Sequence, residues 1–270
     1  QQNLSLLNSV HKHIPILDES GVPKDIISWS DIWNLPVAAP LLGGNELKYV
    51  QDCIKTNWIS SQGDYVKKFE TSFSDYFDGI SSVSVSSGTA ALHLALLALG
   101  IGKGDEVIVP NITFGASANV VVNVGATPIF VDIENKYFTM STNNLRKYIT
   151  KNTKAIMPVH LYGHPCDMDP IMELAKENNL WVIEDCAEAL GAEYKGSKVG
   201  KIGDIGCFSF FANKIITTGE GGMVTTKHQH LMDKIKLFRD HGMSPSRRYW
   251  HEVAGLNYRL TNLQAAIGLA

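Results

Sequence analysis

A lysine that follows an apolar stretch is the residue of this sequence best suited to covalent chemistry. Cys207–Phe211 is apolar and aromatic enough to be a buried strand, Ser209 lies within it, and Lys214 and a glycine-rich turn follow. An amine at the end of a buried strand is poorly hydrated, so it can attack a carbonyl group. Lys214 therefore has the character of a lysine that forms a Schiff base with an aldehyde. The alternative is an ordinary surface lysine, which is the commoner state of a lone Lys.

A second stretch could bind a phosphate group. The segment SSGTAAL at residues 86–92 should lead from a strand through a turn into a long apolar helix. The free backbone N–H groups and the positive dipole end of such a helix attract anions, and Gly88 and Thr89 lie at this point. The alternative is a plain helix N-cap in which Ser87 or Thr89 serves only the helix.

Two further strand ends carry residues that suit a flat cationic ring. Phe114, just after the strand that ends at Pro110, could stack on a heteroaromatic ring, although a lone Phe more often belongs to the core. The segment VIEDCAE places Asp185 and neighbouring acids at a buried strand end. Buried acids need a cationic partner, which a protonated ring nitrogen would provide. The alternative for Asp185 is a helix cap.

Together these four parts predict a site for pyridoxal phosphate. A phosphate cradle, a stacking aromatic ring, an acid for the pyridinium nitrogen and a lysine for the aldehyde are what this cofactor requires. Asp185 would keep the ring nitrogen protonated so that the ring accepts electrons, and Lys214 would act as the general base once an incoming amine has displaced it.

The elements that must position these residues alternate between strands and helices. The expected strands are short, continuous and rich in Val and Ile, which is typical of a sheet covered by helices on both faces. We therefore expect an α/β domain with a mostly parallel sheet, whose ligands gather at the carboxyl ends of the strands. The expected helices are 44–54, 66–76, 89–99, 117–124 and 170–178, and the expected strands are 83–85, 106–109, 128–131, 155–159, 180–184, 207–211 and 222–225.

Composition limits the classes of function. The chain has 270 residues, 44% of them hydrophobic, and a net charge of −3, which gives no reason to expect nucleic acid or an anionic membrane as a partner. Its four cysteines lack metal-type spacing, so we predict no metal site and reduced thiols. No long apolar run or signal peptide is evident, so we expect a soluble, cytoplasmic protein. Because the chain starts at Gln1 and stops at Ala270 inside a helical-looking run, we expect a fragment.

The first part of the chain differs from the rest. Residues 13–32 read as strand, tight turn, strand and helix start. This segment resembles the closing part of a CBS domain, a nucleotide-sensing module, with an ordinary hairpin as the alternative. We therefore divide the chain into an N-terminal segment, 1–37, and a large domain, 38–270.

From about residue 42 onward the sequence resembles the DegT/DnrJ/EryC1/StrS family of sugar aminotransferases that use pyridoxal phosphate. The matching motifs are VSVSSGTAALHLALLALGIGKGDEVIVP, PVHLYGHPCDMDP, VIEDCAEALGAEYKG, GDIGCFSFFANKIITTGEGGMVTT and LFRDHGMSPSRRYWHEVAGLNYRLTNLQAAIG. The resemblance implies the large domain of pyridoxal-phosphate fold type I, which is aspartate aminotransferase-like, with the C-terminal small domain missing from this chain.

The resemblance also implies a role for individual residues. Lys214 bonds to the cofactor aldehyde, Asp185 pairs with the pyridinium nitrogen and Glu188 lies near the phenolic oxygen. Gly88, Thr89 and Ser209 contact the phosphate, and Phe114 stacks on the ring. Asn257 reaches the cofactor phosphate of a neighbouring subunit. The nucleotide-sugar contacts are Trp58, Ser60, Arg247 and Tyr249. His160 and His164 are interpreted as structural residues.

The implied reaction is transfer of an amino group from L-glutamate to C4 of a nucleotide-linked 4-keto-6-deoxy sugar. Within the family, the last of these motifs and the TTGEGG run look most like members that aminate GDP-4-keto-6-deoxymannose. The resemblance implies an obligatory homodimer and a role in the biosynthesis of a polysaccharide such as O-antigen. One alternative is a UDP- or dTDP-linked keto-sugar, aminated at C4 or C3. Another is a non-catalytic nucleotide sensor with a relic cofactor domain.

Overall fold

The structure is a computed structural model that describes residues 13–28 and 39–270, within two compact units, Gln1–Ala39 and Pro40–Ala270. In the first unit, β1 (His13–Leu17) and β2 (Pro23–Ser28) form an antiparallel hairpin. Asp18 Oδ1 accepts the backbone N–H groups of Ser20 and Val22 and so closes the turn. The predicted strand, turn and strand are present, and the predicted helix start lies outside the described residues. The likeness to a CBS domain stays a prediction.

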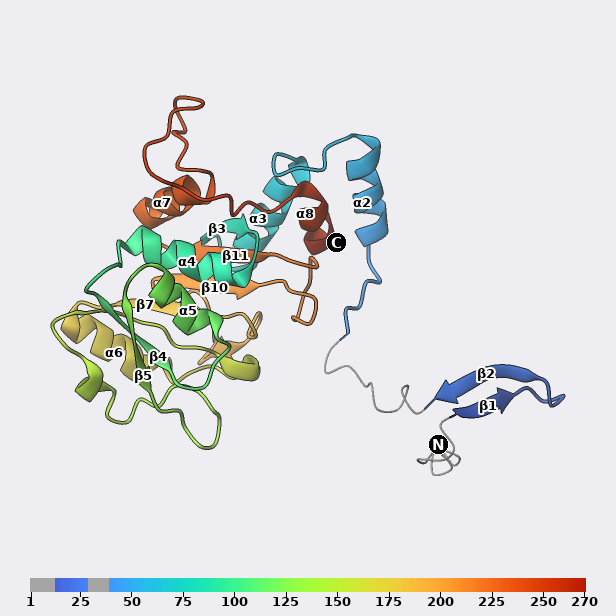
Figure 1. Ribbon diagram of the computed structural model, residues 1–270, viewed down its shortest axis with the longest axis horizontal. Coiled ribbons are helices and arrows are strands. Elements are labelled where there is room, and N and C mark those ends of the chain that lie inside the picture. Colours follow the sequence, from blue (N-terminus) through green and yellow to red (C-terminus); the bar gives the residue numbers. More distant parts are fainter. Residues whose placement is uncertain (1–12, 29–38) are drawn as a thin grey trace. The chain divides into compact units, whose positions relative to one another are not determined.

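The second unit is a three-layer α/β arrangement around a seven-stranded sheet (Figure 1). Its helices and strands in chain order are α2 (Glu46–Lys55), α3 (Asp64–Tyr76), β3 (Ser81–Val85), α4 (Gly88–Leu99), β4 (Glu106–Pro110), α5 (Ala116–Asn123), β5 (Thr127–Val131), η2 (Leu145–Tyr148), β6 (Thr153–Ile156), η3 (Leu161–Gly163), α6 (Met168–Asn178), β7 (Trp181–Asp185), β8 (Glu193–Tyr194), β9 (Ser197–Lys198), β10 (Ile205–Ser209), β11 (Gly222–Thr226), α7 (Gln229–Arg239) and α8 (Asn262–Leu269).

The sheet confirms the predicted α/β class with a mostly parallel sheet. Its strand order is β3-β11-β10-β7-β6-β4-β5. The pairs from β10 through β7, β6 and β4 to β5 are parallel, and β11 is antiparallel to both of its neighbours. The parallel strands therefore end at one common edge, which brings together segments that are far apart in the sequence.

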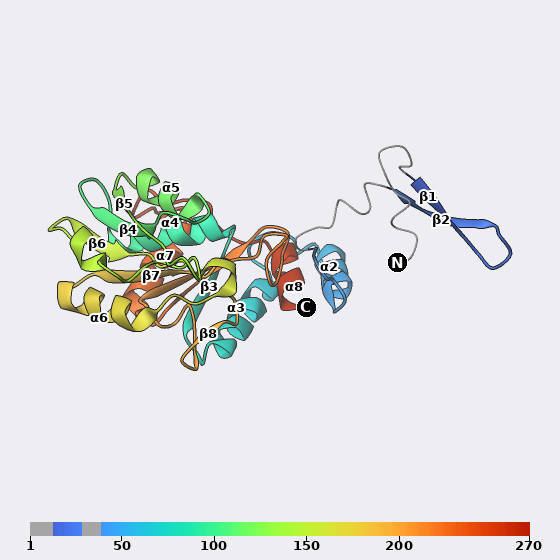
Figure 2. The same cartoon turned by 90° about the horizontal axis from the view of Figure 1, so that it is seen from below.

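Both faces of the sheet are buried, which explains why its strands are continuously apolar. In β4, Val107 and Val109 pack into the core under α4, α5 and α7, whereas Ile108 between them packs with the residues of α6. Figure 2 shows α4 and α5 on one side of the sheet and α3 and α6 on the other. Beneath α3, Phe208 of β10 has its ring centroid 5.2 Å from that of Phe73.

Two predicted strands end earlier than expected. The central strand β10 ends at Ser209 rather than at residue 211, because the chain turns back there and the Thr218 N–H donates to the Phe210 carbonyl, 3.0 Å away. The strand expected at 155–159 ends at Ile156. Both differences lengthen the loops at the edge where the predicted site residues lie. Within the described residues, the structure contains no helix that is both long and apolar enough to cross a membrane.

Candidate active site

A cavity of about 380 Å³ lies at the carboxyl edge of the sheet, between β7, β10 and the start of α4. This is the size range of small-molecule sites, and the position is the one expected for ligands of open α/β sheets. The predicted site residues that line it are Gly88, Thr89, Phe114, Asp185, Glu188, Ser209 and Lys214. The fold thus brings together residues from four separate strand ends.

The start of α4 provides an anion cradle beside β10. Ser87 is the N-cap, and its Oγ accepts the Ala90 N–H at 3.0 Å, so the helix cap that was the alternative interpretation is present. The first N–H groups of a helix have no partner within the helix and can bind an anion. Gly88 permits a close approach here, because a Cβ atom at this position would lie 2.7 Å from the Cβ of Ser209. The glycine is therefore required for the helix start and the Ser209 hydroxyl to face one space.

Asp185 ends β7 and lies at the inner wall of the cavity. Its side chain is buried, and burial raises the pKa of its carboxyl group. Ser117 Oγ donates to Oδ2 at 2.8 Å, and the Ala187 N–H donates to Oδ1 at 3.2 Å. A buried carboxylate with two neutral donors is well suited to pair with a protonated, cationic group of a ligand in the cavity.

Lys214 lies in the turn after β10 and points into the cavity rather than into bulk solvent. Only 18% of its side chain is exposed, and its Nζ lies 3.2 Å from Oε1 of Glu188. The other oxygen of Glu188 accepts the backbone N–H of Tyr162 at 2.8 Å. Tyr162 has a φ of 51°, a left-handed conformation that is costly for a residue with a Cβ. The Glu188 carboxylate is therefore held between the lysine and a strained backbone amide.

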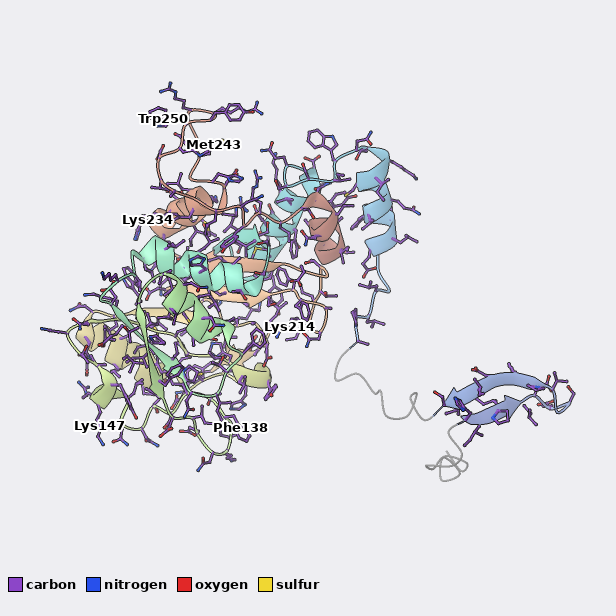
Figure 3. The ribbon with its side chains drawn as sticks, viewed as in Figure 1. Phe138, Lys147, Lys214, Lys234, Met243 and Trp250 are labelled. Carbon is purple, nitrogen blue, oxygen red and sulfur yellow. The ribbon has the colours of Figure 1, made fainter. Side chains whose placement is uncertain are left out.

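Five predicted residues do not line this cavity. The loop with Arg247 and Tyr249 lies well away from Lys214, as the labels of Trp250 and Lys214 show in Figure 3, and the Arg247 guanidinium covers the Trp250 ring at 4.6 Å. Outside the cavity lie Trp58, Ser60, Arg247, Tyr249 and Asn257. Their predicted roles stay predictions, since none of them lines the cavity that contains the lysine.

The sequence reading missed two buried side chains that shape this region. Asn262, at the start of α8, donates from Nδ2 to the Trp58 carbonyl at 2.7 Å and from its backbone N–H to the Ser60 carbonyl at 2.8 Å. It therefore holds the loop that carries Trp58 and Ser60. Ser117 holds Asp185. The position of Ser117, three residues after Phe114 at a helix start, is the only signal of this role in the sequence.

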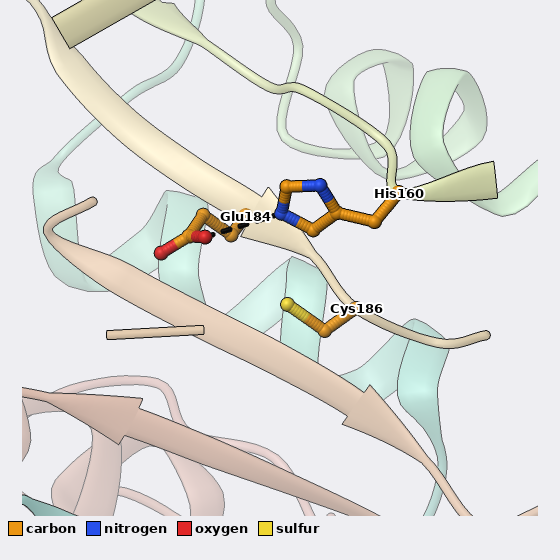
Figure 4. Close-up of side chains that lie close together, drawn as sticks. All are labelled: His160, Glu184 and Cys186. Carbon is orange, nitrogen blue, oxygen red and sulfur yellow. Dashed lines mark hydrogen bonds and ion pairs between the residues drawn. The ribbon is translucent and has the colours of Figure 1, made fainter. Parts of the chain in front are cut away.

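His160, Glu184 and Cys186 form a buried cluster behind the cavity (Figure 4). Cys166 N–H donates to His160 Nδ1 at 3.0 Å, so the proton of the neutral ring is on Nε2, which lies 3.1 Å from Glu184 Oε2. The carboxylate also accepts three backbone N–H groups, from Gly200, Ile202 and Gly203. Each of its oxygens thus has two donors, which leaves the carboxylate no free site for a metal ion.

The third member of the cluster is also a poor metal ligand. Burial raises the pKa of the Cys186 thiol to about 12, so the thiolate that a metal would need does not form at neutral pH. The cluster is therefore a structural brace between β7, the segment before η3 and the 200–203 turn. This agrees with the interpretation of His160 as a structural residue.

This fold, with a lysine and a carboxylate facing one cavity beside an anion cradle, defines a class of cofactor-binding α/β domains. The chain belongs to the DegT/DnrJ/EryC1/StrS aminotransferase family, whose profile matches residues 40–270. GDP-perosamine synthase of Caulobacter vibrioides is 56% identical over 241 residues, which are 89% of this chain and 65% of that protein. The chain thus spans about 65% of the length of this curated relative.

Other relatives extend the comparison. UDP-N-acetyl-3-dehydro-alpha-D-glucosamine 3-aminotransferase of Acidithiobacillus ferrooxidans is 52% identical over 186 residues, 68% of this chain and 50% of that protein. Among solved structures, the aminotransferase from Psychrobacter cryohalolentis has a TM-score of 0.81 and 44% identity, and covers 85% of this chain and 61% of its own. The putative sugar aminotransferase Spr1654 of Streptococcus pneumoniae in its PLP form has a TM-score of 0.81 and 35% identity, with coverages of 87% and 65%.

Proposed function

We propose that this chain carries the cofactor site of an aminotransferase that uses pyridoxal phosphate. The observation that carries the proposal is that Lys214 and Asp185 line one cavity beside the start of α4. The cavity of about 380 Å³ fits a cofactor of this size, and the cradle at Gly88, which a Cβ would fill, fits its phosphate. The donor set fits the cofactor because it offers an amine, a buried carboxylate and an anion cradle in one space.

The roles of the residues follow from their chemistry. When bound, pyridoxal phosphate supplies an aldehyde that condenses with amines and a ring that accepts electrons. The α4 start and Ser209 Oγ would bind the phosphate, and the exposed Phe114 ring would stack on the heteroaromatic ring. Asp185 would hold a proton at the ring nitrogen. Lys214 would supply the amine for the aldehyde and, when free, would move a proton at its Nζ.

The substrate proposal rests on the likeness to GDP-perosamine synthase. We propose that the full-length protein transfers the amino group of L-glutamate to C4 of GDP-4-keto-6-deoxymannose or a related 4-keto-6-deoxy sugar, in the cytoplasm and in polysaccharide such as O-antigen biosynthesis. A UDP-linked keto-sugar is the second candidate, because a relative named as a UDP-sugar 3-aminotransferase is 52% identical. The sugar-nucleotide contacts would be Trp58, Ser60, Arg247 and Tyr249.

We propose a homodimer in which Asn257 reaches the cofactor phosphate of the partner subunit. Asn257 does not line the cavity of its own chain, which supports a role elsewhere. The loop of Arg247 and Tyr249 would serve the partner site in the same way. Size measurement in solution tests the dimer, and mixing Lys214→Ala with Asn257→Ala subunits tests the shared site. Restored activity in the mixture supports the shared site, and a mixture without activity contradicts it.

The experiment that tests the enzyme class is cofactor binding by the full-length protein. Adding pyridoxal phosphate should produce a visible absorbance band that Lys214→Ala does not show, and L-glutamate should remove the band. Turnover of GDP-, UDP- and dTDP-linked keto-sugars then distinguishes the substrates. If the wild type and Lys214→Ala give the same spectrum, the proposed function is wrong.

A further inference from the structure

We propose that Ser117 is a positioning residue that holds the Asp185 carboxylate in place for the cofactor ring nitrogen, with Thr113 as the donor that orients Ser117. The inference rests on the proposed function, because the ring nitrogen belongs to pyridoxal phosphate. It assigns a role to residues outside the predicted site set. It also explains how a carboxylate buried at the end of β7 keeps one orientation.

Ser117 and Asp185 are in direct side-chain contact. Ser117 is fully buried on the first turn of α5, and its Oγ lies 2.8 Å from Oδ2 of Asp185, although the residues are 68 apart in the sequence. A hydroxyl has one proton and an ionised carboxylate can only accept, so Ser117 is the donor. Its backbone is fixed by the helix, so the hydroxyl marks one fixed point for Oδ2.

Thr113 donates the next hydrogen bond, to Ser117. Thr113 Oγ1 lies 2.9 Å from Ser117 Oγ, and either hydroxyl could donate from distance alone. Because the single proton of Ser117 is directed to Asp185, Thr113 must be the donor in this pair. The Phe114 carbonyl, 3.4 Å from Ser117 Oγ, is the weaker competitor for that proton. The result is a directed chain from Thr113 through Ser117 to Asp185.

Ser117 also affects the charge state of Asp185. Burial raises the pKa of the Asp185 carboxyl group, and the hydrogen bond from Ser117 is the largest of the contacts that oppose this effect. A hydrogen bond to the charged form makes the carboxylate a weaker base. A weaker base at this position leaves the shared proton on the ring nitrogen, where it makes the ring a better electron acceptor. Ser117 therefore controls both the place and the basicity of Asp185.

The test compares two probes in the full-length protein: pyridoxal phosphate and its 1-deaza analogue, in which a C–H group replaces the ring nitrogen. Ser117→Ala should lower affinity for pyridoxal phosphate by about tenfold, the size expected for a lost hydrogen bond to a charged group, and should leave affinity for the analogue nearly unchanged. Ser117→Thr keeps the hydroxyl and should therefore keep the wild-type difference in affinity between pyridoxal phosphate and the analogue. In an Asp185→Asn background, Ser117→Ala should have no further effect.

A second variant keeps the test decisive if Ser117→Ala does not fold. Thr113→Val removes the donor to Ser117 at a partly buried position. It should lower the ratio of the affinity for pyridoxal phosphate to the affinity for the analogue, by less than Ser117→Ala does. An equal loss for both probes, or no loss, overturns the positioning role. If the wild type binds neither probe, the cofactor proposal itself is wrong and this inference is lost with it. If the wild type binds pyridoxal phosphate and the ratio is unchanged in both variants, only this inference is wrong.

Discussion

Lys214 and Glu188 form an ion pair in the wall of the cavity, with Nζ 3.2 Å from Oε1 and both side chains mostly buried. Glu188 also accepts the Tyr162 N–H on its other oxygen. One carboxylate thus links the predicted covalent lysine to a backbone segment in a left-handed conformation. Beyond its predicted place near the cofactor, Glu188 therefore determines where the lysine amine lies.

Glu188→Gln should free the Lys214 amine while keeping an acceptor for Tyr162. The neutral amide loses its attraction for the ammonium group, so Lys214 should react faster with an amine-directed reagent in the cofactor-free protein. Stability should change by no more than about 1 kcal/mol, since partly exposed ion pairs contribute little. Mass spectrometry of the labelled lysine measures the rate. An unchanged rate would mean that the ion pair does not hold the amine.

Glu184→Gln should destabilise the protein strongly, although the same chemical change at Glu188 should not. The Glu184 carboxylate accepts from His160 and from the turn that contains Gly200. The amide NH₂ group of Gln would face N–H donors at a fully buried position, so we expect a loss of about 3–5 kcal/mol. Urea denaturation of both variants gives the comparison. Equal losses for the two variants would contradict the structural role of this brace.

Asp185→Asn should stabilise the cofactor-free protein at neutral pH. The folded-state pKa of Asp185 lies above the ordinary 3.8, so the folded state binds a proton more tightly than the unfolded chain does. Stability from this group is therefore greatest below that ordinary value and falls as the pH rises through the folded-state pKa. The variant lacks this loss, and we expect it to be more stable by about 1–3 kcal/mol near pH 7.

The measurement for Asp185→Asn is a thermal unfolding series without cofactor, from acid to neutral pH, on the variant and the wild type. The difference in Tm should grow with pH. The same variant should bind pyridoxal phosphate more weakly, since the ring nitrogen loses its anionic partner. A Tm difference that is constant with pH would show that burial of Asp185 has no energetic cost.

Gly88→Ala should weaken the phosphate cradle. The added Cβ would lie 2.7 Å from the Ser209 Cβ, so the α4 start or β10 must move. Overpacking of this kind costs about 1–3 kcal/mol, and affinity for pyridoxal phosphate should fall by about tenfold or more. Gly43→Ala is the matched control, because its Cβ would meet nothing within 4 Å. Absorbance titration with the cofactor measures both, and equal affinities would contradict the cradle.

The sequence predicted most elements of the large domain, because burial leaves a local pattern, but it missed α7 and the β8–β9 hairpin. The apolar run of β4 indicates a strand that is buried on both faces of the sheet, and the polar turn before α4 indicates where that helix begins. Strand ends were less accurate: β10 stops at Ser209 because the chain turns back and the Thr218 N–H donates to the Phe210 carbonyl. That pairing depends on the return of β11 to the sheet, which local composition does not record.

By itself the sequence determined the α/β class, the chemistry at four strand ends, and the pairing of Lys214 with Asp185 as candidates for one site. Only the tertiary structure decided that Glu188 holds the lysine, that Ser117 holds the acid, and that Asn257 does not line the cavity of its own chain. The physical reason is that a residue's type and spacing follow local burial. Its hydrogen-bond partner depends on which segments the sheet brings to the same edge: Ser117 follows β4, Asp185 ends β7, and the two residues are 68 apart in the sequence.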